Sequence, residues 1–201
     1  MTRRLSVFVR GSIAALALLS VLVAGCVERQ QTWKLANTYG LLPSLQFTMT
    51  QGDGRTVHAE DFRGKVTLLF FGYTHCPDVC PTTLAILARA IKSLGPDADR
   101  VRVLFVTVDP KRDTAGALMH YTQLFGPEFV GLRGDANQLQ QLTKRYRVTY
   151  SLGAPDASGD YDVTHSSAIF VFDSIGEAVL VGNESNSVQD FVHDLKQLLA
   201  D

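Results

Sequence analysis

The sequence predicts an α/β fold in which a central β-sheet is covered by helices on both faces. Two apolar runs, at residues 66–71 and 101–108, have the length and the content of β-branched and aromatic residues that are typical of fully buried strands. Between them, residues 82–94 carry apolar side chains at helical spacing. Buried strands that alternate with helices indicate this fold class.

The remaining elements are predicted from turn signals and from the spacing of apolar side chains. Residues 45–48 and 56–58 flank a Gly-rich turn at 51–54, which predicts an N-terminal β-hairpin. Residues 151–161 are rich in Gly, Pro, Asp and Ser, so we expect an exposed loop or hairpin there. The other expected elements are helices at 114–125, 136–146 and 188–199 and strands at 129–132, 167–172 and 178–181.

Length and charge restrict the class of protein. The chain has 201 residues, with 19 Lys and Arg against 20 Asp and Glu. Loss of an N-terminal signal would remove Arg3, Arg4 and Arg10 and no acidic residue, leaving a single domain with a net charge of about −4. The sequence has no basic stripe, which argues against nucleic acid as a partner.

The N-terminus carries a targeting pattern. A basic start is followed by an almost wholly apolar run at 12–24 and by small residues before Cys26. This pattern resembles a bacterial lipoprotein signal and predicts a signal peptide at 1–25, a lipid on Cys26, a lipid-attached linker at 26–42 and a folded domain at 43–201.

An uncleaved membrane anchor is the alternative interpretation of the same segment. As a helix, residues 12–27 would span about 24 Å, which is less than the roughly 30 Å of the hydrocarbon core. We therefore favour the lipoprotein signal. Either interpretation places the domain outside the cytoplasm, on the periplasmic side of a membrane, where a pair of thiols is oxidised unless a reductant maintains it.

The most informative motif is a pair of cysteines between two predicted elements. Cys76 and Cys80 follow the buried strand at 66–71 and precede a helix that we expect to begin at about Pro81. A helix N-terminus lowers the pKa of nearby thiols and favours redox chemistry or metal binding. The spacing allows both sulfurs to bind one soft ion and also allows a strained disulfide.

One distant histidine adds to this pair. His165 lies directly before the strand expected at 167–172. In thioredoxin-like folds, a strand in this position brings its first residues against the cysteine turn, where thioredoxins have a cis-proline that is absent here. An imidazole at that point would add a nitrogen to two sulfurs, a set that suits Cu(I) and can also hold Cu(II).

Three segments together resemble the SCO/SenC family of thioredoxin-like copper proteins. They are residues 71–81 around the cysteines, 108–114 and 164–166, and the resemblance extends from about residue 45 to residue 199. It implies a thioredoxin-like fold with a mixed sheet and a role in assembling the binuclear copper centre of cytochrome c oxidase.

The resemblance also implies a ligand set. Cys76, Cys80 and His165 would bind one copper ion per chain, as Cu(I) or Cu(II). Thr164 stands where many family members have Asp, so Asp162 becomes a candidate partner for the imidazole ring.

The implied function is that of a metallochaperone and not of an enzyme. Its partners would be the copper-bearing subunit of the oxidase or another copper chaperone, together with a reductant that keeps the thiols reduced. The alternative is a thiol–disulfide oxidoreductase that uses Cys76 and Cys80. We expect His75 to be a solvated turn residue, Asp78 to stabilise the helix start, and residues 109–114 to form a loop that starts a helix.

Overall fold

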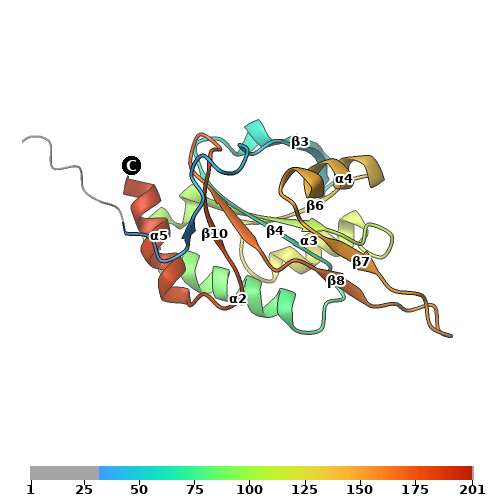
Figure 1. The fold of residues 1–201 in the computed structure, drawn as a ribbon. Helices are drawn as coiled ribbons and strands as arrows, with labels where there is room; N and C mark the ends of the chain where they lie inside the picture. The colour runs from blue at the N-terminus through green and yellow to red at the C-terminus, as the bar shows by residue number, and fades with distance from the viewer. Residues whose placement is uncertain (1–31, 201) are drawn as a thin grey trace, which may run out of the picture. The chain divides into compact units, whose positions relative to one another are not determined.

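The centre of the fold is an eight-stranded sheet in the order β1-β10-β9-β4-β5-β6-β2-β3, seen in a computed structural model that describes residues 32–200 (Figure 1). Strands β4 (Val66–Gly72), β5 (Val101–Thr107) and β6 (Phe129–Arg133) run parallel, whereas β9 (Ile169–Phe172) pairs antiparallel with β4. The mixed sheet confirms the predicted α/β class.

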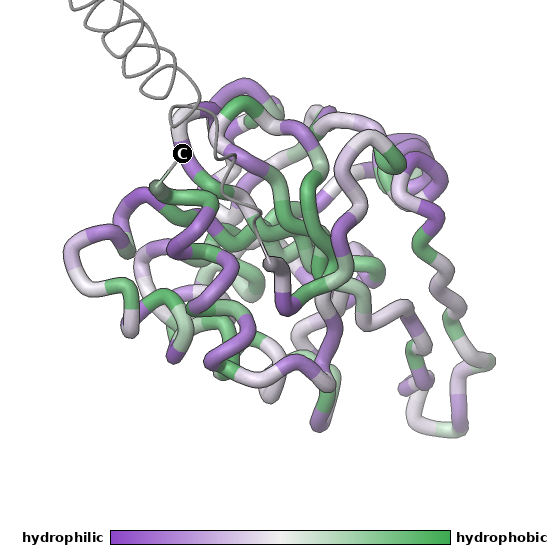
Figure 2. The backbone as a smooth tube through the Cα atoms, turned by 60° about the vertical axis from the view of Figure 1, so that its left-hand side comes forward, coloured by the Kyte–Doolittle hydropathy of each residue, from purple (hydrophilic) through white to green (hydrophobic). Residues whose placement is uncertain are grey.

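Both faces of the central sheet are covered. Every residue of β4 is buried, and since side chains alternate between the faces of a strand, each face must be packed against other elements. Helix α2 (Val79–Lys92) packs against α5 (Val188–Ala200), which also contacts β4, whereas α3 (Ala115–Gln123) packs against β6 and β2. Figure 2 shows hydrophobic residues concentrated in the central strands.

The smaller helical elements complete the domain. Helix α4 (Ala136–Arg145) is capped by Asp135, whose side chain accepts a hydrogen bond from the backbone N–H of Gln138. Two short 3-10 helices lie at Ala59–Phe62 and Gly95–Arg100. The helices predicted at 114–125, 136–146 and 188–199 are therefore confirmed in position, with ends that differ by a few residues.

Two hairpins extend the parallel core. Strand β10 (Ala178–Gly182) pairs with β9 as the sequence predicts. The N-terminal hairpin also forms, but its first strand, β2 (Thr48–Gln51), begins three residues later than expected and pairs with β3 (Thr56–His58). Pairing between β2 and β6, at Thr50 and Arg133, sets this register and joins the hairpin to the sheet.

The start of the described chain belongs to the domain. Strand β1 (Ala36–Asn37) pairs antiparallel with β10, and the backbone N–H groups of Lys34 and Leu35 donate to the buried carboxylate of Asp194. Part of the segment expected as a linker therefore pairs with the sheet. The predicted signal peptide and Cys26 lie outside the described residues, and none of the helices described is long and apolar enough to cross a membrane.

A two-stranded hairpin is separate from the main sheet. Strand β7 (Tyr150–Leu152) pairs antiparallel with β8 (Val163–His165), and Tyr150 lies opposite His165. The loop expected at 151–161 is the outer part of this hairpin, which projects to the lower right in Figure 1. His165 thus lies at the inner end of the hairpin, where the chain turns back toward β9.

Candidate metal centre

The cysteine turn joins the buried end of β4 to helix α2. The helix begins at Val79, two residues before the expected start, so Cys80 lies within its first turn. Pro81 fits there because the first N–H groups of a helix have no partner within the helix in any case. Asp78 is the residue that precedes the helix, but its side chain makes no capping hydrogen bond.

The sulfur of Cys76 accepts the hydrogen bond that a capping side chain would usually accept. The backbone N–H of Cys80 donates to Cys76 Sγ over 3.3 Å. Cys76 is partly exposed and Cys80 is completely buried, and both are free cysteines. The start of α2 therefore holds the two sulfurs side by side, one facing the solvent and one facing the core.

The acidity of Cys80 differs from the expectation for a thiol at a helix N-terminus. Burial raises the pKa of Cys80 far above its ordinary value, and a hydrogen bond from the backbone of Tyr73 offsets this only in part. Burial thus outweighs the helix dipole at this position. The thiol is protonated at neutral pH, and a metal ion that binds here has to displace the proton.

His165 faces the buried sulfur. Its Nε2 lies 3.3 Å from Cys80 Sγ, and its Nδ1 lies 3.0 Å from the carbonyl oxygen of Ser166. A carbonyl only accepts, so Nδ1 carries the proton and the lone pair of the neutral ring is at Nε2, directed at the cysteines. The partner that orients the ring is thus the Ser166 carbonyl, whereas the side chain of Asp162 is exposed.

Aromatic rings border the imidazole on two sides. The rings of Phe70 and Tyr73 each lie 6.0 Å from the His165 ring, in edge-on orientation. Burial raises the pKa of Tyr73 to about 12, and negative charge on Cys76 and Cys80 adds to the shift. The tyrosine is therefore neutral, and both rings pack beside the imidazole.

The three side chains converge on a single point. One sulfur of each cysteine and one nitrogen of His165 lie within 4.8 Å of one another. Donor atoms that share an ion at bond lengths of about 2.0 to 2.3 Å lie within about 4.6 Å of one another, so small side-chain rotations bring all three to bonding distance. A hollow of about 360 Å³, lined in part by Cys76, His165 and Glu184, leaves the centre open on one side.

The side chains of His75, Met49 and Thr164 lie outside the cluster of Cys76, Cys80 and His165. The side chain of His75 is 56% exposed, contacts Thr74 Oγ1 and lies 3.5 Å from a carboxylate oxygen of Asp113, as expected for a turn residue. Met49 is fully buried in the core. Thr164 uses its hydroxyl to bond Ser151 Oγ across the hairpin over 2.6 Å.

The sequence analysis missed the buried carboxylate that supports the cysteine turn. Asp113 accepts hydrogen bonds from Thr74 N–H, from Thr74 Oγ1 at 2.6 Å and from Thr107 Oγ1 at 2.6 Å, and it is completely buried. Thr114 caps α3 as expected for a helix-starting loop. Strands β4 and β5 are parallel and end at the same edge of the sheet. An acidic residue shortly after β5 was therefore the feature of the sequence that could have indicated this contact with the cysteine turn.

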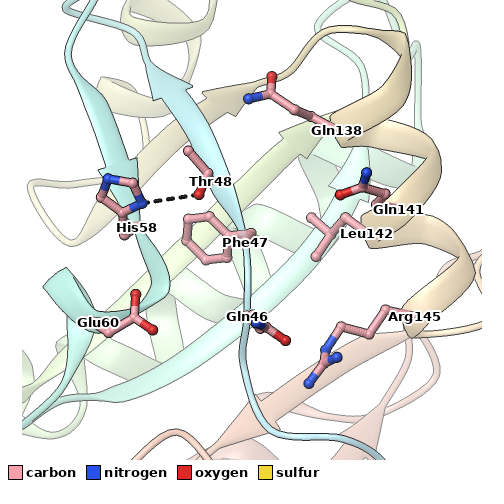
Figure 3. Close-up of a pocket in the computed structure, with 9 residues that line it drawn as sticks. All are labelled: Gln46, Phe47, Thr48, His58, Glu60, Gln138, Gln141, Leu142 and Arg145. Atoms are coloured by element: carbon pink, nitrogen blue, oxygen red, sulfur yellow. Dashed lines mark hydrogen bonds between the residues drawn. The ribbon is translucent and has the colours of Figure 1, made fainter.

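A larger hollow elsewhere has no comparable chemistry. It measures about 510 Å³ and lies between the N-terminal hairpin and α4 (Figure 3). Three of its polar side chains are amides, none of its lining residues is a cysteine, and His58 already bonds Thr48 Oγ1. The residues that line it are Gln46, Phe47, Thr48, His58, Glu60, Gln138, Gln141, Leu142 and Arg145. Chemistry, and not size, therefore makes the cysteine–histidine cluster the candidate site.

Residues 41–200 match the family model SCO1/SenC. The chain belongs to the SCO1/SenC family. A mitochondrial SCO2 homolog from Bos taurus is 38% identical over 156 residues, which cover 77% of this chain and 59% of the relative. The chain thus spans about three fifths of the length of that relative.

Solved structures of the family support the same assignment. ScoI from Bradyrhizobium japonicum, solved with copper bound, is 37% identical with a TM-score of 0.70, over 77% of this chain and 98% of that one. Apo Sco1 from Thermus thermophilus is 36% identical with a TM-score of 0.74, over 85% of this chain and 99% of that one. The predicted family and its thioredoxin-like fold are confirmed.

Proposed function

We propose that this protein binds one copper ion through Cys76, Cys80 and His165 and transfers it to an acceptor during assembly of cytochrome c oxidase. The main support is the convergence of two sulfurs and one imidazole nitrogen within 4.8 Å. Thiolates are soft ligands that favour Cu(I), and imidazole binds copper in either oxidation state. Copper bound to the Bradyrhizobium japonicum relative agrees with this choice of metal.

The surroundings of the ligands suit a carrier that must release its cargo. Cys80 is buried, but Cys76 and His165 border the open hollow. An acceptor that enters from this side could replace the exposed ligands one at a time, so that copper never passes through water. The likeness to the family makes the copper-bearing oxidase subunit, or another copper chaperone, the proposed partner.

Thiol–disulfide exchange is the less favoured function. A redox pair needs only the two sulfurs, whereas here an imidazole with its lone pair facing Cys80 occupies a third position. In addition, burial raises the pKa of Cys80, which makes this thiol a poor nucleophile. Copper binding does require the reduced thiols, so a dithiol reductant is part of the proposal.

The proposed location follows from the N-terminal sequence. Removal of residues 1–25 would leave Cys26 as the lipid-bearing first residue, attached to the domain by a short linker on the periplasmic side of a membrane. Mass spectrometry of the protein from its host membrane tests this: a lipid-modified N-terminal cysteine is expected, and an intact residue 1 would contradict it.

Copper stoichiometry tests the proposed binding. The reduced protein should bind about one Cu(I) per chain, and the form with a Cys76–Cys80 disulfide should bind none, because the disulfide removes two of three ligands. His75→Ala is the matched control, since this exposed histidine neighbours Cys76 but lies outside the cluster, and it should retain full binding. Equal binding by the oxidised form would contradict the proposal.

A further inference from the structure

The hairpin that carries His165 has few backbone contacts to hold it in place. Within residues 32–200, strands β7 and β8 pair only with each other, through three residue pairs. The pairing ends at Ser166 and Gly153, whose N–H groups donate to the carbonyl oxygens of Thr149 and Asp162. A two-stranded hairpin is only marginally stable by itself. Side-chain contacts with the rest of the domain must therefore define where the hairpin, and with it His165, lies.

A buried carboxylate at the end of β5 provides one such contact. Asp109 is completely buried, and its Oδ1 accepts a hydrogen bond from the hydroxyl of Tyr161 over 2.8 Å. Burial acts to raise the pKa of Asp109, but hydrogen bonds from Arg112 and Tyr161 outweigh it and hold the pKa below the ordinary value. The carboxylate is thus charged, and Tyr161 connects the hairpin directly to it.

Arg112 provides the second contact. Its guanidinium donates to Asp109 through Nε and to Asp160, on the hairpin, through Nη1. The same group lies 3.9 Å from the centre of the Tyr161 ring and 5.7 Å from that of Tyr73. One arginine side chain therefore spans the space between the hairpin and the cysteine turn.

We propose that Asp109, Arg112, Asp160 and Tyr161 form a latch that holds the β7–β8 hairpin against the domain and so positions His165 at Cys80. Tyr161 lies four residues before His165 and two residues before β8 begins, so movement of the hairpin at Tyr161 moves the imidazole. Tyr73 connects Arg112 to the imidazole, because its ring lies 5.7 Å from the Arg112 guanidinium and 6.0 Å from the His165 ring. The role of the latch in copper binding rests on the proposed function of His165 as a ligand.

The two halves of the latch should contribute unequally. The hydrogen bond from Tyr161 to Asp109 joins a hydroxyl to a buried charge, and its loss should raise hairpin opening about tenfold or more. Asp160 is 70% exposed, so its ion pair with Arg112 is screened by water, and its loss should raise opening only about twofold.

Amide hydrogen exchange of the full, metal-free protein tests the latch. Tyr161→Phe keeps the ring and removes only the hydroxyl, and Asp160→Asn removes the ion pair from an exposed position where folding is not at risk. Asp162→Asn is the matched control: it removes one charge from the same segment, directly before β8, at an exposed residue with no side-chain hydrogen bond among the described residues. Exchange at the Gly153 and Ser166 amides should rise in the first two variants, most in Tyr161→Phe, and stay unchanged in the control.

Exchange at the amides of β4 and β5 distinguishes a latch from general destabilisation. These amides should be unaffected in every variant. Equal acceleration in the hairpin and in the core, or no acceleration in either latch variant, would overturn the proposal. Since the measurement needs no metal, its outcome is independent of whether copper binds.

Copper release then connects the latch to the ligand. Transfer of Cu(I) from the protein to a chelator should be about tenfold faster in Tyr161→Phe and unchanged in Asp162→Asn. If copper release is unchanged in Tyr161→Phe while amide hydrogen exchange in the hairpin is faster, the proposal that the latch positions His165 is overturned. Failure of the wild-type protein to bind copper would instead overturn the proposed function.

Discussion

The sulfur side and the imidazole side of the centre are supported very differently. Cys76 follows a strand in which every residue is buried, and Cys80 lies within the first turn of α2. The buried carboxylate of Asp113 accepts hydrogen bonds from Thr74 in the turn between the two elements. His165 ends a short strand outside the main sheet, and the polar contacts of Asp109 and Arg112 hold its hairpin. The packed core therefore holds the two sulfurs in place. Hydrogen bonds and an ion pair between side chains hold the imidazole nitrogen in place.

This difference suits a protein that both binds and releases a metal ion. Movement of the sulfurs would disturb the hydrophobic core, whereas movement of the hairpin against the domain breaks the side-chain contacts of Tyr161 and Asp160 and leaves the eight-stranded sheet intact. Of the three proposed ligands, the imidazole nitrogen is thus the one that we expect to leave first. The predictions below test whether the two sides differ in this way.

Loss of a sulfur should have the largest effect. Cys76→Ser and Cys80→Ser each leave one thiolate, and we expect the affinity for Cu(I) to fall by more than about a hundredfold. Loss of a residue that only hydrogen-bonds to a metal ligand already lowers metal affinity about ten- to a hundredfold, so loss of a ligand itself should lower it more. Competition with a Cu(I)-specific chelator measures the change. Retention of wild-type affinity by either variant would show that its cysteine is not a ligand.

Loss of the imidazole nitrogen should lower the affinity for Cu(I) by a smaller factor and should leave the redox chemistry of the thiols unchanged. His165→Ala keeps both sulfurs at the start of α2, so Cys76 and Cys80 should still form and break their disulfide. Cu(I) affinity should fall about tenfold, since two thiolates alone can hold this ion. The same chelator competition and a thiol titration measure both properties. A variant that could no longer form the disulfide would show that the two sides are not independent.

A substitution in the core beside Cys80 should shift the sulfurs and weaken the packing around them. A methyl group at Gly72 would lie 2.6 Å from Phe105 Cε2 and 2.8 Å from Cys80 Sγ, closer than packed atoms allow. Gly72→Ala should therefore destabilise the fold by about 1–3 kcal/mol and weaken copper binding a few-fold. Gly116→Ala is the control, because nothing lies within 4 Å of the added group in α3.

Thermal unfolding and chelator competition check the two glycine variants together. The melting temperature should fall in Gly72→Ala by about 2–12 °C and should rise or stay unchanged in Gly116→Ala. Equal melting temperatures in Gly72→Ala and the wild-type protein would mean that the sulfur side is less rigidly packed than described.

Local patterns in the sequence predict most of the fold but not its long-range contacts. Apolar runs and helical spacing were sufficient to place β4, β5, α2 and α5. They could not place β1 or β8, since a strand of two or three residues has no periodicity and forms only because a partner strand lies beside it.

The same limit applies to the site. Cys76, Cys80 and His165 were singled out by motif and by resemblance to the family, and the structure brings them together. The carboxylate of Asp113 beneath the turn, and the contact of Tyr161 with Asp109, join residues 39 and 52 positions apart. Nothing in the local sequence specifies such pairs, because burial of a charged side chain depends on the packed fold around it.

Nitrogen coupling in the electron paramagnetic resonance spectrum of the Cu(II)-loaded protein tests the central claim most directly. The account predicts hyperfine coupling to one imidazole nitrogen, lost in His165→Ala and retained in His75→Ala. A wild-type spectrum that persists unchanged in His165→Ala would contradict the account, because copper would then be bound without the side chain that the hairpin brings to the cysteines.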